Sequence, residues 1–129
     1  MKQENICDIN VISGAILDSA YKVHTELGPG LLEAAYEACL AHELRKNGYQ
    51  VKTQLTLPVY YDGIAIELGY RIDLLVEDSV IVELKTVEKI MPIHEAQLLS
   101  YLKLGHIKVG LLLNFKTKHL RDGIVRKAL

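Results

Sequence analysis

Two carboxylates and a lysine near the middle of the chain have types and a spacing that could bind a cation. Asp73 lies in one apolar segment, and Glu83 and Lys85 lie two residues apart in the next. A turn over residues 77–79 would pair the two segments as antiparallel strands, with Asp73 directly opposite Glu83. The Cβ atoms of such a pair lie about 5 Å apart, and like charges in this relation destabilise a sheet. The pattern therefore predicts a cation beside the two acids.

Two cations are candidates for this position. Lys85 shares a face with Glu83, because residues two apart in a strand point to the same side. A divalent ion is the second candidate, since two carboxylates, a backbone carbonyl and water supply the oxygen ligands that Mg²⁺ prefers. The two candidates are compatible. A plainer interpretation also stays open, in which Arg71 joins these residues on a solvated sheet face with weak local ion pairs.

Polar residues of predicted helices could join this group. Gln97 and Tyr101 are four residues apart in a segment with helical spacing, so both could face the same sheet. Glu33 lies in the first turn of another helical segment, where it would either interact with the helix macrodipole or supply a third carboxylate. For His24, just before a Gly-Pro-Gly turn, a structural role is favoured over lining the site.

The elements that would position these residues follow from the spacing of apolar side chains. Spacings of three and four predict helices, and alternation with period two predicts strands. Helices are expected over 11–27, 31–46 and 92–104, and strands over 51–60, 64–76, 80–85 and 109–113, the last regular element. The first three strands form an antiparallel meander, with a hairpin turn at Asp62-Gly63 and an edge position favoured by Pro58. The last strand, continuously apolar, is typical of a strand covered on both faces.

The predicted register of the second and third strands makes one sheet face wholly apolar. It pairs Val76 with Val80, Leu74 with Val82 and Ile72 with Leu84.

Length, composition and charge limit the class of protein. The chain has 129 residues, of which 50% are hydrophobic, which suits a single domain with its own core. We expect that domain to span 1–129, with a helix and Gly-Pro-Gly corner in 1–29 and a basic tail in 116–129. The 15 Lys and Arg against 16 Asp and Glu exclude nucleic-acid binding by bulk charge alone.

Cysteine usage and hydropathy indicate a cytoplasmic protein. Cys7 and Cys39 have no spacing of a disulfide framework or metal motif, and Cys39 is expected to pack on an apolar helix face. We find neither a signal peptide nor a stretch near the roughly 20 apolar residues that a membrane helix needs.

An ordered set of motifs frames the residues discussed above. The motifs span 24–30, 30–36 (Gly-Leu-Leu-Glu-Ala-Ala-Tyr), 71–76, 83–85 (Glu-Leu-Lys), 96–102 and 110–115. In order and spacing this set resembles a family of small prokaryotic proteins named for its GxxExxY signature, which is placed in the PD-(D/E)xK nuclease superfamily. The resemblance implies an α/β (α+β) fold with a restriction-endonuclease-like core: helices, a three-stranded antiparallel meander, a helix and a further strand in a mixed sheet.

The resemblance also implies roles for individual residues. Asp73, Glu83 and the backbone carbonyl of Leu84 would hold Mg²⁺ or Mn²⁺. Lys85 would orient the attacking water or stabilise charge on the phosphorane. It implies Glu33 as the helical acid and Gln97 as the polar residue of the following helix, with Tyr101 as a looser transfer. Beside these, the further candidates for contacting substrate or supporting the site are Tyr36, Arg71 and His24, together with Tyr101.

Two functions are consistent with these features. The first is divalent-metal-dependent hydrolysis of phosphodiester bonds in nucleic acid, of endonuclease type, with DNA ahead of RNA as the partner. The alternative is a non-catalytic module that binds nucleic acid or protein on a nuclease-like fold. Near-neutral charge and small size favour the alternative, because a duplex needs a broad contact surface. A partner subunit or a homodimer could supply that surface to a nuclease.

Overall fold

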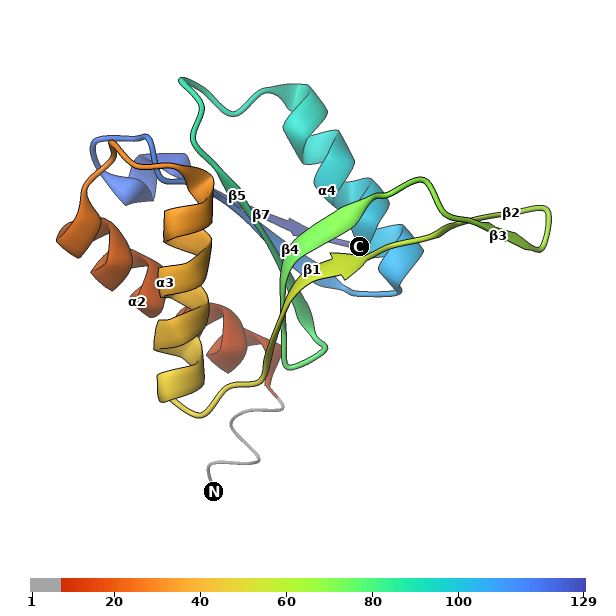
Figure 1. Ribbon diagram of the computed structural model, residues 1–129, viewed down its shortest axis with the longest axis horizontal. Helices are drawn as coiled ribbons and strands as arrows, with labels where there is room; N and C mark the ends of the chain where they lie inside the picture. Colours follow the sequence, from red (N-terminus) through yellow and green to blue (C-terminus); the bar gives the residue numbers. More distant parts are fainter. Residues whose placement is uncertain (1–7) are drawn as a thin grey trace.

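The chain folds as a mixed sheet with helices on both faces (Figure 1). The computed structural model describes residues 8–129. Its elements are α2 (Ile9–Leu27), α3 (Glu33–Lys46), β1 (Val51–Thr56), β2 (Val59–Tyr61), β3 (Ile64–Ile66), β4 (Arg71–Val76), β5 (Val80–Lys85), α4 (Pro92–Gly105), β6 (Val109–Asn114), the 3₁₀ helix η1 (Leu120–Gly123) and β7 (Ile124–Ala128). Helices α2 and α3 cover one face of the sheet, and α4 covers the other. This architecture is consistent with a restriction-endonuclease-like fold.

The three predicted helices are present, with small shifts at their ends. Helix α2 begins earlier than predicted because the Asp8 side chain caps it by accepting a hydrogen bond from the Asn10 amide at 2.8 Å. Helix α3 begins at Glu33, since Leu32 is extended. Helix α4 includes Gly105, and His106, in the left-handed conformation with φ of 56°, ends it. None of the described helices is both long and apolar enough to cross a membrane.

The predicted meander is interrupted by a projecting hairpin. Strands β2 and β3 form a separate two-stranded sheet, here called the arm, which extends away from the body (Figure 1). The expected continuous strands 51–60 and 64–76 are therefore wrong: the first breaks near Pro58, which has no amide for a ladder, and the second breaks before Arg71, where Gly69 has φ of +78°. The Asp62-Gly63 turn is confirmed, since β2 and β3 pair directly across it.

The five-stranded sheet has the order β1-β4-β5-β6-β7. Strand β1 lies at an edge, as Pro58 predicted, and α4 forms the crossover between the parallel strands β5 and β6. Every residue of β6 is buried. The prediction that 109–113 is the last regular element is wrong, because residues 116–129 include η1 and β7, and β7 pairs with β6. The missed strand, Ile-Val-Arg-Lys-Ala, lacks the alternation that marks a half-buried strand.

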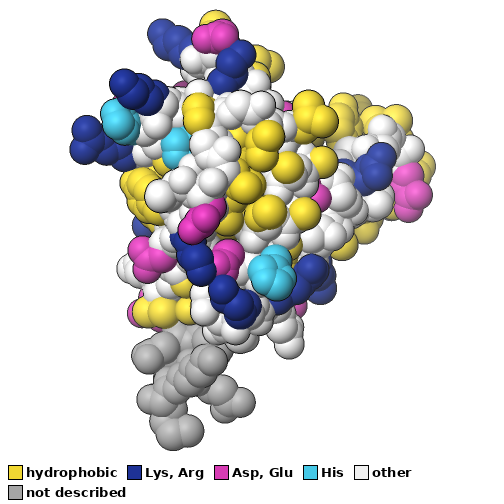
Figure 2. Space-filling view, turned by 60° about the vertical axis from the view of Figure 1, so that its left-hand side comes forward, with side chains coloured by type: hydrophobic (Ala, Val, Ile, Leu, Met, Phe, Trp, Pro, Cys, Tyr) yellow, Lys and Arg dark blue, Asp and Glu magenta, His cyan; other side chains and the backbone are white. Residues whose placement is uncertain are grey.

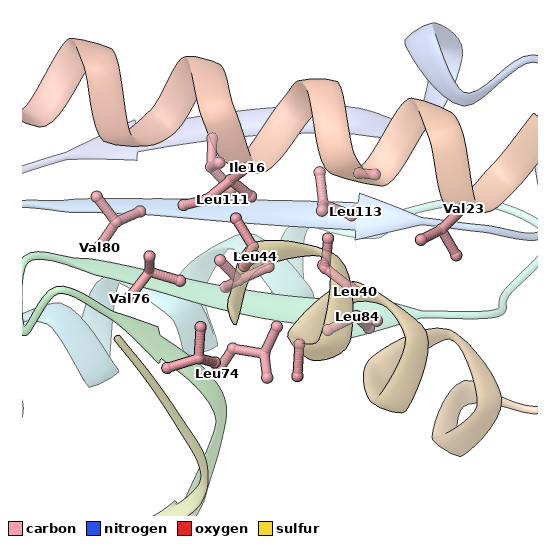
Figure 3. Packing of buried hydrophobic residues seen from close by; sticks show 14 of the residues in the cluster. Ile16, Val23, Leu40, Leu44, Leu74, Val76, Val80, Leu84, Leu111 and Leu113 are labelled. Carbon is pink, nitrogen blue, oxygen red and sulfur yellow. The ribbon is translucent and has the colours of Figure 1, made fainter. Parts of the chain in front are cut away.

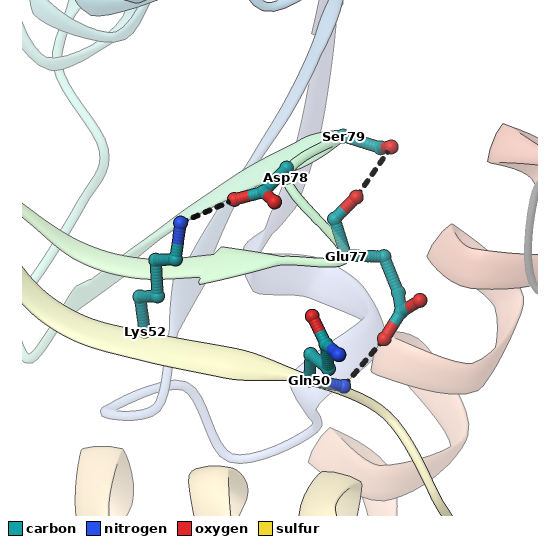
Figure 4. Close-up of polar contacts among 5 residues, drawn as sticks. All are labelled: Gln50, Lys52, Glu77, Asp78 and Ser79. Carbon is teal, nitrogen blue, oxygen red and sulfur yellow. Dashed lines mark hydrogen bonds and ion pairs between the residues drawn. The ribbon is translucent and has the colours of Figure 1, made fainter.

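The turn between β4 and β5 fixes the register on which the site depends (Figure 4). Val76 pairs with Val80 across three residues, as predicted. Side chains hold the turn to β1: the Glu77 carboxylate accepts a hydrogen bond from the Gln50 amide, and Lys52 pairs with Asp78 at 2.8 Å.

Two apolar clusters fill the layers on either side of the sheet. In the larger cluster, α2 and α3 pack on strands β4, β5 and β6 (Figure 3). Fully buried members include Ile16, Leu40, Leu44, Leu74 and Leu113. The smaller cluster joins α4 to the opposite face. On the outer side of α2 and α3, hydrophobic side chains also gather in the middle of a face with charged side chains around them (Figure 2). Cys39 packs against the larger cluster, as predicted.

Candidate active site

The acid pair lies where the ladder between β4 and β5 stops. Regular pairing ends at Leu74 and Val82. Beyond that point the Asp73 amide donates to Glu83 Oε2 at 2.8 Å, and the Leu84 amide donates to Asp73 Oδ2 at 2.9 Å. Each carboxylate thus takes the place of a carbonyl in the ladder and binds the other strand. The two acids are brought together as the register predicted.

One part of the predicted register is wrong beyond this break in pairing. Ile72 does not continue the pairing toward Leu84, and it packs under α4 with Leu75 and Ile81. The predicted wholly apolar face with Ile72 beside Leu74 is therefore wrong. The side-chain hydrogen bonds of Asp73 and Glu83 replace the ladder there, so the strict alternation of β4 ends at Asp73.

Glu83 is the most strongly perturbed acid of the site. Glu83 is only 5% exposed. Burial, and then the charge of Asp73, raise the pKa of Glu83 to about 8, against the opposing hydrogen bond from the Asp73 amide and the charge of Lys85. Lys85 forms none of the ion pairs seen among residues 8–129. Its charge therefore offsets the effects of burial and of Asp73 on the pKa of Glu83 only partly.

The first two turns of α3 bring two more acids toward Asp73. Burial and the charge of Asp73 raise the pKa of Glu33, while Lys85 and hydrogen bonds with Thr86 act in the opposite direction. Glu33 thus lies in the first helical turn and in the field of Asp73. Glu37 lies one turn further along α3, and burial raises its pKa as well.

Glu37 and Gln54 are site residues that the sequence analysis missed. The Gln54 side-chain amide donates to Glu37 Oε1 at 2.6 Å and, more weakly, to Asp73 Oδ1 at 3.3 Å. Gln54 lies in β1 with φ of 51°, a left-handed conformation that is unusual inside a strand. The available signals were the spacing of four between Glu33 and Glu37 and the alternation of β1.

Helix α4 closes the other side of the site. The Gln97 side-chain amide donates to the Tyr101 hydroxyl at 3.0 Å. Burial raises the pKa of Tyr101, and the charge of Glu83 raises it further, so the hydroxyl lies in the field of the acid pair. The predicted placement of Gln97 and Tyr101 on one helix face toward the sheet agrees with this geometry.

Two other candidates have structural roles, and a third is exposed. Tyr36 is fully buried, stacks on Phe115 and joins the Gly28 carbonyl to the Leu31 amide through its hydroxyl. It therefore holds the corner before Glu33 and has no surface for a substrate. A ring nitrogen of His24 bonds the Thr117 carbonyl at 2.8 Å, in the structural role favoured for it. Arg71 is exposed at the start of β4.

The oxygen-rich donor set suits a hard divalent cation. Asp73 and Glu83 each use one oxygen on a backbone amide, and the charge of Lys85 only partly offsets the effect of Asp73 on Glu83. Carboxylate and carbonyl oxygens are the ligands of Mg²⁺ and Mn²⁺. Within residues 8–129 no three His, Cys, Asp or Glu residues are close enough to form a ready metal cage. The fit therefore rests on the acid pair with a backbone carbonyl and water, and Glu33 lies outside this set.

Comparison with known proteins gives one match. The sequence model of the PD-(D/E)XK nuclease superfamily matches residues 10–127. Comparisons with curated proteins and with solved structures gave no significant match.

Proposed function

Because the chain belongs to the PD-(D/E)XK nuclease superfamily, we propose that it hydrolyses phosphodiester bonds in nucleic acid with a divalent cation. The observation that carries the proposal is the reciprocal bonding of Asp73 and Glu83 to opposite backbone amides. This arrangement holds two carboxylates together at a cost in charge repulsion, with a lysine two residues away.

The residues of the acid pair would hold the metal. Asp73, Glu83 and the Leu84 carbonyl are its proposed ligands, with Mg²⁺ or Mn²⁺ as the ion. When bound, such an ion polarises the scissile phosphate and lowers the pKa of a water molecule.

The remaining residues would act on substrate and water directly. Lys85 carries a positive charge beside the acid pair, so it would orient the attacking water or stabilise negative charge on the phosphate. Glu33, whose raised pKa favours proton uptake, would bind water near the metal. Gln97 would hold the Tyr101 hydroxyl in place through their hydrogen bond.

The finer assignments belong to the same proposal. The 30–36 motif supports membership of the prokaryotic GxxExxY family within the superfamily. We propose a single domain over 1–129, a cytoplasmic location, DNA ahead of RNA as substrate, and a homodimer as a means of enlarging the contact surface.

Cleavage assays with matched variants test the proposal. Purified protein is incubated with DNA and RNA, single-stranded and duplex, in Mg²⁺, in Mn²⁺ and in EDTA. We expect cleavage that needs the metal and is lost in Glu83→Gln and Lys85→Ala, but kept in the control Glu67→Gln, an acid on the exposed segment after the arm. Absence of cleavage on every substrate, or cleavage that survives both site variants, would contradict the proposal.

A non-catalytic binding module is the second candidate function. The net charge of −1 and the lack of a three-residue metal cage among the described residues favour it. Calorimetry with Mn²⁺ separates the two candidates. Metal binding that is abolished in Asp73→Asn, together with no turnover of any substrate, would support the module and contradict the nuclease.

A further inference from the structure

A cleft beside the acid pair has no assigned role. It has a volume of about 620 Å³ and lies between the base of the arm and α4. Val59 and Tyr70 line one side, Ile93 and Tyr101 line the other, and Lys85 lies in its wall. The volume falls within the range of pockets that hold small organic ligands. Lys85 therefore connects the proposed reaction centre with a separate binding space.

Two tyrosine rings form part of the cleft. The ring centroids of Tyr70 and Tyr101 are 6.3 Å apart, and the ring planes are tilted by 55°. Tyr101 is buried, whereas Tyr70 is 43% exposed and so has ring surface available for another aromatic group. The Tyr101 hydroxyl lies in the field of Glu83, which places this ring between the cleft and the acids.

The charge of the lining is suited to one kind of ligand. The described residues that line the cleft include Lys85 but no Asp or Glu. Apolar and aromatic side chains alternate in the lining with polar ones that can hydrogen-bond to a ring edge, namely His94, Gln97 and Ser100. Together with Lys85, such a lining matches a flat heterocyclic ring joined to an anionic phosphate. A nucleobase on the strand being cut has this chemistry.

We propose that the cleft binds an unpaired nucleobase adjacent to the phosphate at Asp73 and Glu83, and that the substrate is single-stranded nucleic acid. This inference rests on the proposed function. A base within a duplex is stacked on its neighbours and could not enter the cleft, whereas an unpaired base can stack on tyrosine. The net charge of −1 also disfavours the broad phosphate contacts on which duplex binding depends.

Binding assays on an uncleaving background test the inference. In Glu83→Gln protein, fluorescence anisotropy measures the Kd for a labelled 12-nucleotide strand and for the matched duplex. The test variants are Tyr70→Ala, Tyr70→Phe and Ile93→Asp, which puts a negative charge on an exposed wall residue. The matched control is Tyr61→Ala, a tyrosine that is 73% exposed on the arm and outside the cleft.

We expect the single strand to bind more tightly than the duplex. Tyr70→Ala should weaken strand binding about five- to a hundredfold, as loss of base stacking does in other single-strand sites. Ile93→Asp should also weaken it, while Tyr70→Phe, which keeps the ring, and Tyr61→Ala should bind like the background protein. A 2-aminopurine in the strand should lose fluorescence on binding, and this loss should depend on Tyr70.

The outcomes separate this inference from the proposed function. Equal or tighter duplex binding, or equal effects of Tyr70→Ala and Tyr61→Ala, would overturn the cleft assignment. In protein with an intact Glu83, cleavage whose kcat/KM is unaffected by Tyr70→Ala would overturn the cleft assignment alone and leave the proposed hydrolysis standing. Binding of the single strand that needs Tyr70, without cleavage by protein with an intact Glu83, would support the cleft assignment and contradict only the hydrolytic function.

Discussion

At the scale of single residues, the acid pair is a site in which protons and metal ions compete. Burial and the charge of Asp73 hold the pKa of Glu83 near 8, so the carboxyl keeps its proton at neutral pH when no cation is present. A divalent ion would reverse that preference, because its charge favours the carboxylate. Metal binding should therefore release a proton and tighten as the pH rises toward 8.

The stability of the metal-free protein should fall with rising pH because of Glu83. In the unfolded chain this carboxyl titrates near its ordinary value of 4.5, and in the folded protein near 8. The folded state thus holds the extra proton between these values, and the free energy of unfolding should decrease from about pH 4.5 to 8. Urea unfolding in EDTA across this range measures the trend. Glu83→Gln should flatten the profile, and an unchanged slope in this variant would contradict the assignment.

The Tyr36 hydroxyl should matter for stability more than its small size indicates. It donates to the Gly28 carbonyl and accepts from the Leu31 amide, so Tyr36→Phe removes two partly buried hydrogen bonds from the corner. We expect a loss of about 1–3 kcal/mol in the free energy of unfolding. Tyr21→Phe, at an exposed position on α2, is the matched control and should change little. Equal effects in urea unfolding would show that the corner does not depend on this hydroxyl.

At the scale of elements, the parts that local patterns specify were predictable. Helical periodicity located α2, α3 and α4, and the length of the 77–79 turn was enough to bring Asp73 to Glu83. The break in pairing beyond Leu74 was not predictable, because it depends on hydrogen bonds that form only after the strands meet. The role of Gln54 was not predictable for the same reason, since it depends on the approach of Glu37 from a different element.

Close packing of α4 on the sheet should depend on Gly110 in β6. A Cβ at this position would lie 2.7 Å from Leu98 Cδ1 and 3.2 Å from Leu102 Cδ2, so the Leu98 side chain or α4 would have to shift. Gly110→Ala should lower the free energy of unfolding by about 1–3 kcal/mol, as overpacking does in other cores.

Gly14 in α2 provides the matched control for this substitution. No atom lies within 4 Å of a Cβ built there, so Gly14→Ala should stabilise the helix by about 0.5–1 kcal/mol. Chemical unfolding of both variants gives the comparison. A neutral or stabilising Gly110→Ala would mean that the layer between α4 and the sheet is loosely packed.

At the scale of the whole molecule, part of the positive charge near the chain's end is already paired. Lys116 pairs with Glu88 at 2.7 Å, and Lys127 with Glu95 at 2.6 Å. By contrast, Lys118 and Arg121 belong to no ion pair seen in residues 8–129, and they line a hollow of about 530 Å³ beside Gly28. This corner leads directly into α3 and Glu33, so the hollow is where a nucleic-acid backbone could approach the site.

Salt dependence should identify this hollow as the place of phosphate contact. Each cation that neutralises a phosphate releases counterions, so removing two contacts should reduce the slope of log Kd against log salt by about 1.4 for a single strand. We expect this reduction in Lys118→Gln/Arg121→Gln on the Glu83→Gln background. The control Lys52→Gln/Lys127→Gln removes the same charge from residues engaged in ion pairs and should leave the slope nearly unchanged. Equal reductions in both double variants would contradict this assignment. They would mean that the overall charge attracts the strand and that neither Lys118 nor Arg121 contacts a particular phosphate.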